Sequence, residues 1–268
     1  MKLNTIFAEN CLDTMAKMPE GFVDLVVTSP PYDDLRTYDG YSFKFELVAE
    51  HLFRVIADGG VVVWVVGDQS LNFNESGNSF KQALFFQATG FNLLDTMIYS
   101  KPAANGARMN RHIYIQAFEY MFVFSKGKPK TINLIHDRPN LSHGRHLPAR
   151  KIRDKDGVGR VKKAKSVKIE EFGRRTNIWY YATGQGASTK DKIAQKHPAV
   201  FPEQLAADHI KSWSNKGDLV YDPFMGSGTT AKMALLLDRK YLGSEISKKY
   251  CWVAAKRLKP YINQTKML

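Results

Sequence analysis

A run of nine residues near the C-terminal end of the sequence has the residue types of a ligand-binding turn. Residues 222–230 read Asp-Pro-Phe-Met-Gly-Ser-Gly-Thr-Thr, and they lie where a predicted strand ends and a predicted helix begins. Open α/β sheets bind ligands at such places. Glycines let a ligand approach the backbone, and a helix N-terminus offers N–H groups that have no partner inside the helix.

The residues around this turn narrow the class of ligand. A phosphate-binding loop needs a lysine directly after the glycine, where the chain has Thr229, and a dinucleotide site needs a third glycine that is absent. The remaining candidate is a nucleoside with a charged amino-acid tail. Asp222 can then face a cationic amino group, and Glu245, at the end of the next predicted strand, can accept both ribose hydroxyls. A purely structural tight turn is the alternative.

A second stretch, Thr28-Ser29-Pro30-Pro31-Tyr32, follows the apolar strand predicted over residues 22–28. Consecutive prolines remove two N–H donors and stiffen the backbone, while their carbonyl groups stay available as acceptors. Acceptors next to the Tyr32 ring suit a planar group that carries an NH₂, such as the edge of a nucleobase. The alternative is a rigid strand exit with Tyr32 packed in the core.

The charge of the chain is concentrated in one segment. The 268 residues carry a formal net charge of +13, and residues 126–175 hold sixteen basic residues against five acidic ones. This excess predicts a polyanionic partner, which is either nucleic acid or an anionic membrane surface. The segment lacks an amphipathic apolar face, which disfavours the membrane, and a solvated loop without a partner is the remaining alternative.

Composition excludes several other classes of protein. With 44% hydrophobic and 24% charged residues, the chain has an ordinary globular composition, and no apolar run approaches the ~18 residues of a spanning helix. The N-terminus has no long apolar stretch, so we expect a cytoplasmic protein. Two cysteines cannot build a disulfide framework. His143 and His146 lack a cysteine or acid to complete a metal site, so we predict no metal.

Apolar periodicity predicts an alternation of strands and helices. Strands are expected over residues 22–28, 61–66, 92–100, 119–125, 218–221 and 241–245, and helices over residues 45–56, 78–89, 202–215, 229–237 and 248–259. Gly59 and Gly60 are expected to separate the first helix from the strand that follows. This alternation predicts an α/β fold with a mostly parallel twisted sheet covered on both faces.

Together, TSPPY and DPFMGSGTT resemble the DNA methyltransferases that use S-adenosylmethionine to modify exocyclic amino groups. The target-amine motif comes first, the basic segment second and the cofactor motif last, an order similar to the circularly permuted β group of these enzymes. The resemblance extends over most of the chain and implies a Rossmann-like methyltransferase fold. It covers two catalytic parts, residues 1–125 and residues 176–268. The basic segment, residues 126–175, has no such match and is predicted by elimination to be the target-recognition insertion.

The resemblance also implies roles for individual residues. Ser29, Pro30, Pro31 and Tyr32 form the catalytic set: the first two accept hydrogen bonds from the target amine, and Tyr32 stacks on the extruded base. The expected cofactor-binding residues are Asn10, Thr28, Asp222, Pro223, Phe224, Gly226, Ser227, Gly228, Thr229 and Glu245. Asn10 stands where the family often has an acid. The expected DNA-binding residues are Lys101, Arg145, Arg150, Lys162, Lys163, Lys165, Arg174 and Arg175.

The predicted reaction is methyl transfer from S-adenosylmethionine to a base flipped out of double-stranded DNA. Ser29 favours N4 of cytosine, because SPPY is more usual in N4-cytosine enzymes and DPPY in N6-adenine enzymes. An N6-adenine enzyme is the main alternative. An RNA or protein-amide methyltransferase and a catalytically silent DNA-binding module are the others. A homodimer and a cognate restriction enzyme stay open as further partners.

Overall fold

The computed structural model describes residues 1–31, 44–102, 114–146, 151–153, 159–161, 168–184 and 186–264. These residues form two compact units. The first, here called the catalytic unit, comprises Met1–Asn133 and Asn177–Leu268, and the second, here called the basic unit, comprises Leu134–Thr176.

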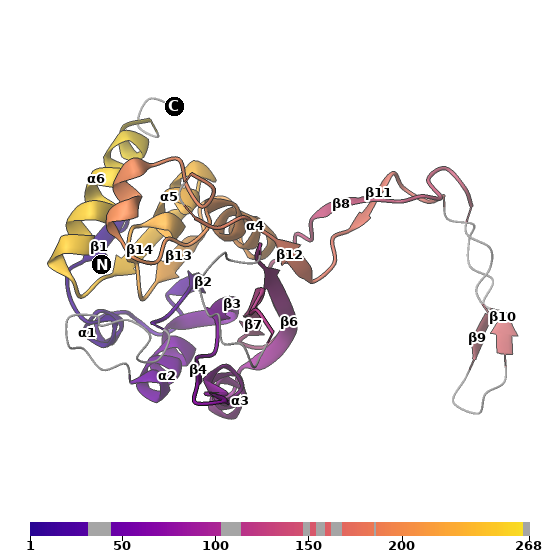
Figure 1. Cartoon of the computed structure of the whole chain (residues 1–268), viewed down its shortest axis with the longest axis horizontal. Helices are drawn as coiled ribbons and strands as arrows, with labels where there is room; N and C mark the ends of the chain where they lie inside the picture. Colours follow the sequence, from indigo (N-terminus) through magenta and orange to yellow (C-terminus); the bar gives the residue numbers. More distant parts are fainter. Residues whose placement is uncertain are drawn as a thin grey trace. The chain divides into compact units, whose positions relative to one another are not determined.

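Within the described residues, one eight-stranded sheet runs through the catalytic unit (Figure 1). Its strands are β1 (Thr5–Phe7), β2 (Val23–Thr28), β3 (Ile56–Val66), β6 (Asn92–Ser100), β7 (Phe118–Ser125), β12 (Ile178–Tyr180), β13 (Leu219–Asp222) and β14 (Lys240–Ser244). Their order is β1-β14-β13-β2-β3-β7-β6-β12. All neighbours are parallel except β3 with β7 and β6 with β7. The predicted α/β class with a mostly parallel sheet is confirmed.

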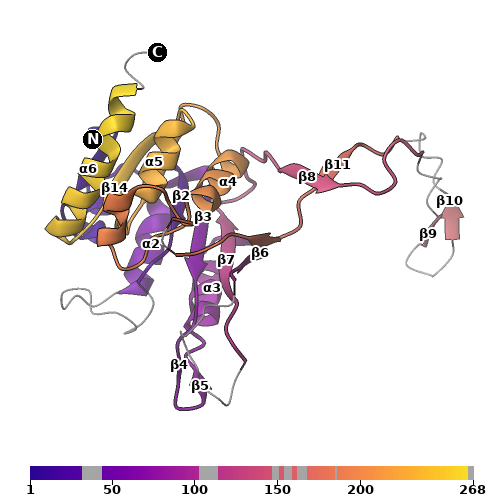
Figure 2. The same ribbon diagram turned by 45° about the horizontal axis from the view of Figure 1, so that its top comes forward.

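Two groups of helices cover the sheet. They are α1 (Cys11–Ala16), α2 (Phe45–Val55), α3 (Asn78–Thr89), α4 (Glu203–Trp213), α5 (Thr229–Leu236) and α6 (Lys248–Gln264), with a 3-10 helix, η2 (Lys192–Lys196). In Figure 1, α1, α2 and α3 lie on one side of the sheet and α4, α5 and α6 on the other. The turned view in Figure 2 again shows α4, α5 and α6 side by side. Helices on both faces bury the central strands, which explains why β2 and β3 are almost continuously apolar.

Aromatic side chains fill the core between the sheet and the helices α2 and α3. Trp64 of β3 is fully buried, and its indole Nε1 donates a hydrogen bond of 2.8 Å to Oε1 of Gln82. The ring of Phe86 stacks on Phe124 with the centroids 4.5 Å apart. The satisfied indole N–H and the stacked rings show that this side of the sheet is closely packed against α3.

The strand β3 begins earlier than the sequence indicates. The predicted break at Gly59 and Gly60 is wrong, because both glycines lie inside β3. Gly59 has φ +74°, and its N–H donates to the carbonyl oxygen of Lys126 at 2.7 Å. A Cβ on Gly59 would lie 2.9 Å from the backbone oxygen of Lys128, so glycine here permits a close approach of two backbone segments instead of ending an element.

Helix α6 continues past its predicted end. It includes Pro260 and ends at Gln264. Proline removes a backbone hydrogen bond from a helix. The turn that follows is held by Tyr261, whose hydroxyl donates to Oδ1 of Asp191 at 3.1 Å. A tertiary contact therefore stabilises the helix beyond the residue at which sequence rules end it.

The basic unit consists of short strands. β8 (His136–Pro139) pairs with β11 (Phe172–Arg174), and β9 (Lys151–Arg153) pairs with β10 (Gly159–Val161), both antiparallel. All four residues of β8 are exposed. Another small hairpin, β4 (Ser70–Leu71) with β5 (Asn74–Glu75), belongs to the catalytic unit and precedes α3. Among the described residues, none of the helices has the length and apolarity needed to cross a membrane.

Candidate active site

Two motifs from distant parts of the sequence meet at the ends of β2 and β13. These strands are parallel neighbours, with Val26 opposite Tyr221, so their carboxyl ends reach the same edge of the sheet. Thr28 Oγ1 donates a hydrogen bond of 2.7 Å to Oδ1 of Asp222. Thr230 Oγ1 donates to the carbonyl oxygen of Val27 at 3.0 Å. Topology and two buried hydrogen bonds therefore join the TSPPY motif to the DPFMGSGTT motif.

Asp222 is a buried acid at this junction. Its side chain accepts hydrogen bonds from Thr28 and from the backbone N–H of Phe224, which lies 3.0 Å from Oδ1. Burial nevertheless raises the pKa of Asp222 from 3.8 to about 6. Within the described part of the chain, no basic side chain forms an ion pair with it. An ionised carboxylate in this position would be stabilised by a cationic ligand.

Glu245 holds the glycine turn from the next strand. Its Oε2 accepts from the backbone N–H of Gly226 at 2.8 Å, and its Oε1 accepts from the N–H of Ser247 at 2.8 Å. Burial outweighs these hydrogen bonds and raises the pKa of Glu245 above its ordinary value. Each carboxylate oxygen keeps acceptor capacity, because it has more lone pairs than protein partners.

Two glycines give the turn its shape. Gly226 has φ +51° and Gly228 has φ +82°, which are conformations that other residues rarely adopt. A Cβ on Gly226 would lie 3.0 Å from Nε2 of His197, and Gly228 is the N-cap residue of α5. Phe224 is half-buried, with its ring edge-on to Trp64 at 6.1 Å, and Pro223 is buried. The side of the turn that faces the interior of the protein is thus closely packed.

The side chains of Ser227 and Thr229 contact Arg257 of α6. Arg257 Nη1 donates to the carbonyl oxygen of Ser227 at 3.0 Å, to its Oγ at 3.1 Å and to Thr229 Oγ1 at 2.9 Å. Both side chains are buried. The structure therefore gives these two predicted cofactor ligands a role in holding the turn to α6.

Asn10 and its neighbour Cys11 lie at the start of α1. Asn10 is the N-cap residue, and its Oδ1 accepts from the backbone N–H of Leu12 at 2.9 Å, a standard way to satisfy the first turn of a helix. Cys11 is buried, and burial raises the pKa of its thiol to about 12. Since the nucleophilic form of cysteine is the thiolate, Cys11 is unreactive at neutral pH.

The predicted catalytic set is described only in part. Ser29 is partly exposed, Pro30 is buried and Pro31 is partly exposed directly after the end of β2. Tyr32 lies outside the described residues. The three described positions leave β2 at the edge of the sheet where Asp222 leaves β13.

The predicted DNA-binding residues differ in their surroundings. Lys101, in the catalytic unit, pairs with Glu119 at 2.7 Å. Arg175, in the basic unit, forms a bidentate ion pair with Asp137, with Nε to Oδ2 at 2.9 Å. Arg145 and Arg174 are exposed. Four further candidates lie outside the described residues: Arg150, Lys162, Lys163 and Lys165.

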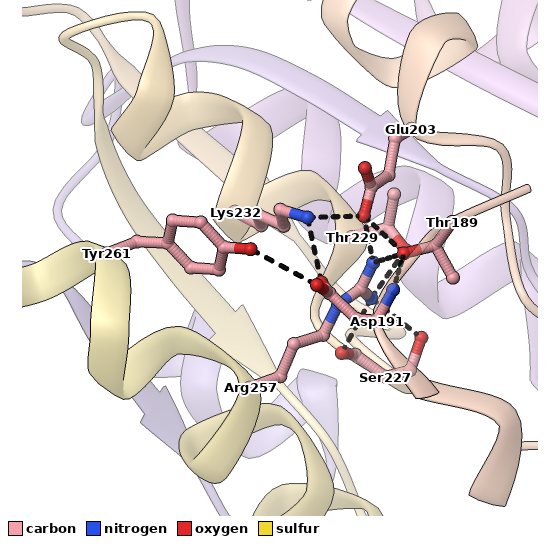
Figure 3. A network of polar contacts seen from close by, with 8 residues as sticks. All are labelled: Thr189, Asp191, Glu203, Ser227, Thr229, Lys232, Arg257 and Tyr261. Carbon is pink, nitrogen blue, oxygen red and sulfur yellow. Dashed lines mark hydrogen bonds and ion pairs between the residues drawn. The ribbon is translucent and has the colours of Figure 1, made fainter. Parts of the chain in front are cut away.

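Sequence reasoning missed a buried ionic cluster next to the turn, which Figure 3 shows. Arg257 and Lys232 face Asp191 and Glu203, with N–O distances from 2.6 to 2.8 Å. A signal was present in the sequence, because Lys232 and Arg257 interrupt otherwise apolar helix faces. Their partners come from residues 189–203, which carry no motif that would indicate the pairing.

The α/β fold of the chain is similar to the folds of solved DNA methyltransferases. It resembles the PvuII DNA methyltransferase, described as cytosine-N4-specific, with a TM-score of 0.69 and 18% identity, covering 97% of this chain and 91% of that one. It also resembles TTHA0409 of Thermus thermophilus in complex with S-adenosylmethionine, with a TM-score of 0.62, 24% identity and coverage of 96% and 95%.

The sequence comparisons then give the family. A family model described as DNA methylase, of the N6 and N4 type, matches residues 23–256. The orphan methyltransferase M.BamHII of Bacillus amyloliquefaciens is 59% identical over 242 residues, which cover 90% of each chain. M.BglII of Bacillus subtilis, named a type II methyltransferase, is 27% identical and is covered over 68% of its length. The chain belongs to the N6/N4 DNA methylase family, and it is an S-adenosylmethionine-dependent DNA amino-methyltransferase. The predicted family, enzyme class and cofactor are confirmed.

Proposed function

We propose that the junction of β2 and β13 is the active site, and that it methylates N4 of a cytosine flipped out of double-stranded DNA. The observation that carries this proposal is the Thr28–Asp222 hydrogen bond of 2.7 Å. It joins the acceptor motif to the glycine turn, which supports transfer from a methyl donor that the turn would hold to an amine that Ser29 and Pro30 would hold. Transfer between two bound groups requires such proximity.

The residues of the turn fit S-adenosylmethionine. Asp222 is buried without a basic partner among the described residues, which suits the charged methionine end of the cofactor. Glu245 keeps acceptor capacity for the two ribose hydroxyls beside Gly226. When bound, the cofactor supplies a methyl group on a positively charged sulfur, which is already activated for transfer. The protein then has to bind the cofactor and the target base, orient them toward each other, and exclude water.

The acceptor motif activates the other reactant. The exocyclic amine of cytosine is a weak nucleophile, because its lone pair is delocalised into the ring. The Ser29 hydroxyl and the Pro30 carbonyl accept its two hydrogens, which favours a pyramidal nitrogen with a localised lone pair. Methyl transfer would leave a positive charge on the nitrogen, which the Ser29 hydroxyl and the Pro30 carbonyl would stabilise until the extra proton is lost to solvent. Charge placement of this kind supplies much of an enzyme's rate.

Base flipping completes the substrate side. Extruding a base from a duplex costs a few kcal/mol, and Tyr32 stacking is proposed to offset part of that cost. Ser29 favours cytosine, because a hydroxyl can also donate to the cytosine ring nitrogen whereas a carboxylate cannot. The alternative is N6-adenine, which presents the same kind of amine.

The proposed target-recognition insertion is residues 126–175, which include most of the basic unit. It is inserted into a circularly permuted methyltransferase fold between the catalytic parts of residues 1–125 and 176–268. Two of its exposed arginines, Arg145 and Arg174, are the proposed base readers. A homodimer is proposed from the β-group resemblance. A cognate restriction enzyme would agree with the type II names of several relatives and disagree with the orphan name of M.BamHII. Because the substrate is DNA, we place the enzyme in the cytoplasm.

Replacement of Ser29 tests the proposal. Ser29→Ala removes an acceptor that acts in the transition state, so we expect turnover to fall roughly 100-fold or more while the Kd for S-adenosylmethionine stays close to that of wild type. Ser70→Ala, another partly exposed serine, is the matched control and should keep full turnover. Wild-type turnover of Ser29→Ala would remove Ser29 from the catalytic set.

A further inference from the structure

Arg257 of α6 is a buried cation whose donors are all used inside the catalytic unit. Its side chain has no exposed surface. Nε donates to Asp191 at 2.8 Å, and Nη2 donates to Glu203 at 2.6 Å and to Thr189 Oγ1 at 3.1 Å. Nη1 donates to Ser227 and Thr229 in the glycine turn. Every nitrogen of the guanidinium group therefore has a partner, as Figure 3 shows.

The surrounding charges balance. Lys232 Nζ lies 2.7 Å from both Asp191 and Glu203, so two cations face two anions. Burial alone would raise the pKa of Asp191, but hydrogen bonds from Lys232 and Arg257 outweigh it and hold the pKa below its ordinary value. The carboxylate is thus ionised at neutral pH. A paired and hydrogen-bonded cluster of this kind fixes geometry more than it adds stability.

The cluster joins three segments that are distant in the sequence. Residues 189–203 supply Thr189, Asp191 and Glu203, α5 supplies Lys232, and α6 supplies Arg257. The same segment carries His197, whose Nε2 lies 3.0 Å from the position that a Cβ on Gly226 would take. The His197 ring lies edge-on to Tyr250, with the centroids 4.4 Å apart. One side of the glycine turn is therefore held by Arg257 and another by a segment that Arg257 anchors.

We infer that Arg257 is a positioning residue for the methyl donor: it holds the glycine turn in its cofactor-binding shape without touching the cofactor. This inference rests on the proposed function of the turn. Arginine is needed because its planar group reaches two acids on one side and the turn on the other. A lysine carries the same charge but has three donors from one point, so it can satisfy the acids or the turn but not both.

The test compares Arg257→Lys with a control that disturbs the same cluster. Lys232→Met also breaks buried ion pairs, but Lys232 makes no hydrogen bond to Ser227 or Thr229. Glu245→Gln serves as the reference for the cofactor site itself. Calorimetry with S-adenosylmethionine, melting temperatures, and separate kcat and KM values are measured for the wild-type enzyme and the three variants.

We expect Arg257→Lys to raise the Kd and KM for S-adenosylmethionine roughly tenfold or more, with a smaller change in kcat. Lys232→Met should lower the melting temperature at least as much and keep a near wild-type Kd. Equal Kd values for wild type and Arg257→Lys, with Glu245→Gln weakened, would overturn the inference and leave the proposed site standing. A wild-type Kd for Glu245→Gln would instead contradict the proposed site. If Arg257→Lys does not fold, Arg257→Gln is used instead, and its amide hydrogen exchange is compared with that of the wild type. Unchanged protection of the amides of residues 224–229 would overturn the inference.

Discussion

At the scale of single residues, the raised pKa of Asp222 has a measurable effect on the stability of the protein. Burial raises its pKa to about 6, while the unfolded chain has the ordinary value of 3.8. The folded state therefore binds a proton more tightly between pH 4 and pH 6, so this group makes the free energy of unfolding fall as the pH rises through that window. Above pH 6, Asp222 is ionised, and the buried carboxylate lowers the free energy of unfolding.

Asp222→Asn should therefore stabilise the cofactor-free protein at pH 7.5, by on the order of 1–3 kcal/mol. The amide oxygen of the substituted side chain can still accept from Thr28 and from the Phe224 N–H. At pH 5 the gain should be smaller, because wild-type Asp222 is then largely protonated. Urea denaturation at both pH values checks this, and an identical difference at the two would contradict the raised pKa.

Sequence reasoning identifies the residues that carry distinctive chemistry and misses those that act through pairing. Asp222 and Glu245 are predicted from their places at strand ends, and the structure puts Asp222 beside Thr28 and Glu245 beside the turn. Ser227 is predicted as a cofactor ligand, yet its hydroxyl contacts Arg257. That contact depends on how α6 packs, which no local pattern in the sequence specifies.

At the scale of elements, the apolar periodicity finds the long strands and helices but not the shortest ones. β1 and β12 have three residues each, too few for a period to appear. The start of β3 is missed because Gly59 and Gly60 are usually breakers. Their role depends on the neighbouring segment that contains Lys128, which only the tertiary structure brings close.

Gly59→Ala should destabilise the protein by on the order of 1–3 kcal/mol, because it adds strain at a positive φ and a clash with backbone atoms. Gly127→Ala is the matched control, since Gly127 has φ +71° but no atom within 4 Å of an added Cβ. The difference between the two melting temperatures measures the clash. Equal losses in both variants would mean that the close approach at Gly59 adds nothing.

In the basic unit, Arg175 is held by Asp137, whereas Arg145 and Arg174 are exposed. We expect the alanine variant of either Arg145 or Arg174 to lose ~1–3 kcal/mol of discrimination at a single base position. The dependence of binding on salt should change little. Competition binding with singly substituted duplexes measures this. Full discrimination in both alanine variants would contradict base reading by this pair, and Arg175→Ala serves as the comparison.

At the scale of the whole molecule, two features act together. The catalytic unit brings together two motifs from distant parts of the sequence, and most of the positive charge lies in the segment that contains the basic unit. We propose that phosphate contacts supply affinity that is independent of the DNA sequence, and that the site at β2 and β13 supplies the chemistry. The central claim is that this chemistry is methyl transfer to an exocyclic amine of DNA.

Nucleoside mass spectrometry tests that claim directly. Duplex DNA is incubated with the enzyme and S-adenosylmethionine carrying a labelled methyl group, and is then digested to nucleosides. We expect the label in N4-methylcytosine, and we expect Ser29→Ala to lower the rate of labelling roughly 100-fold or more. Label in N6-methyladenine would overturn the choice of base and keep the mechanism. Label on a ring carbon, such as C5 of cytosine, would contradict the account, because that reaction requires a covalent nucleophile and not a pair of acceptors.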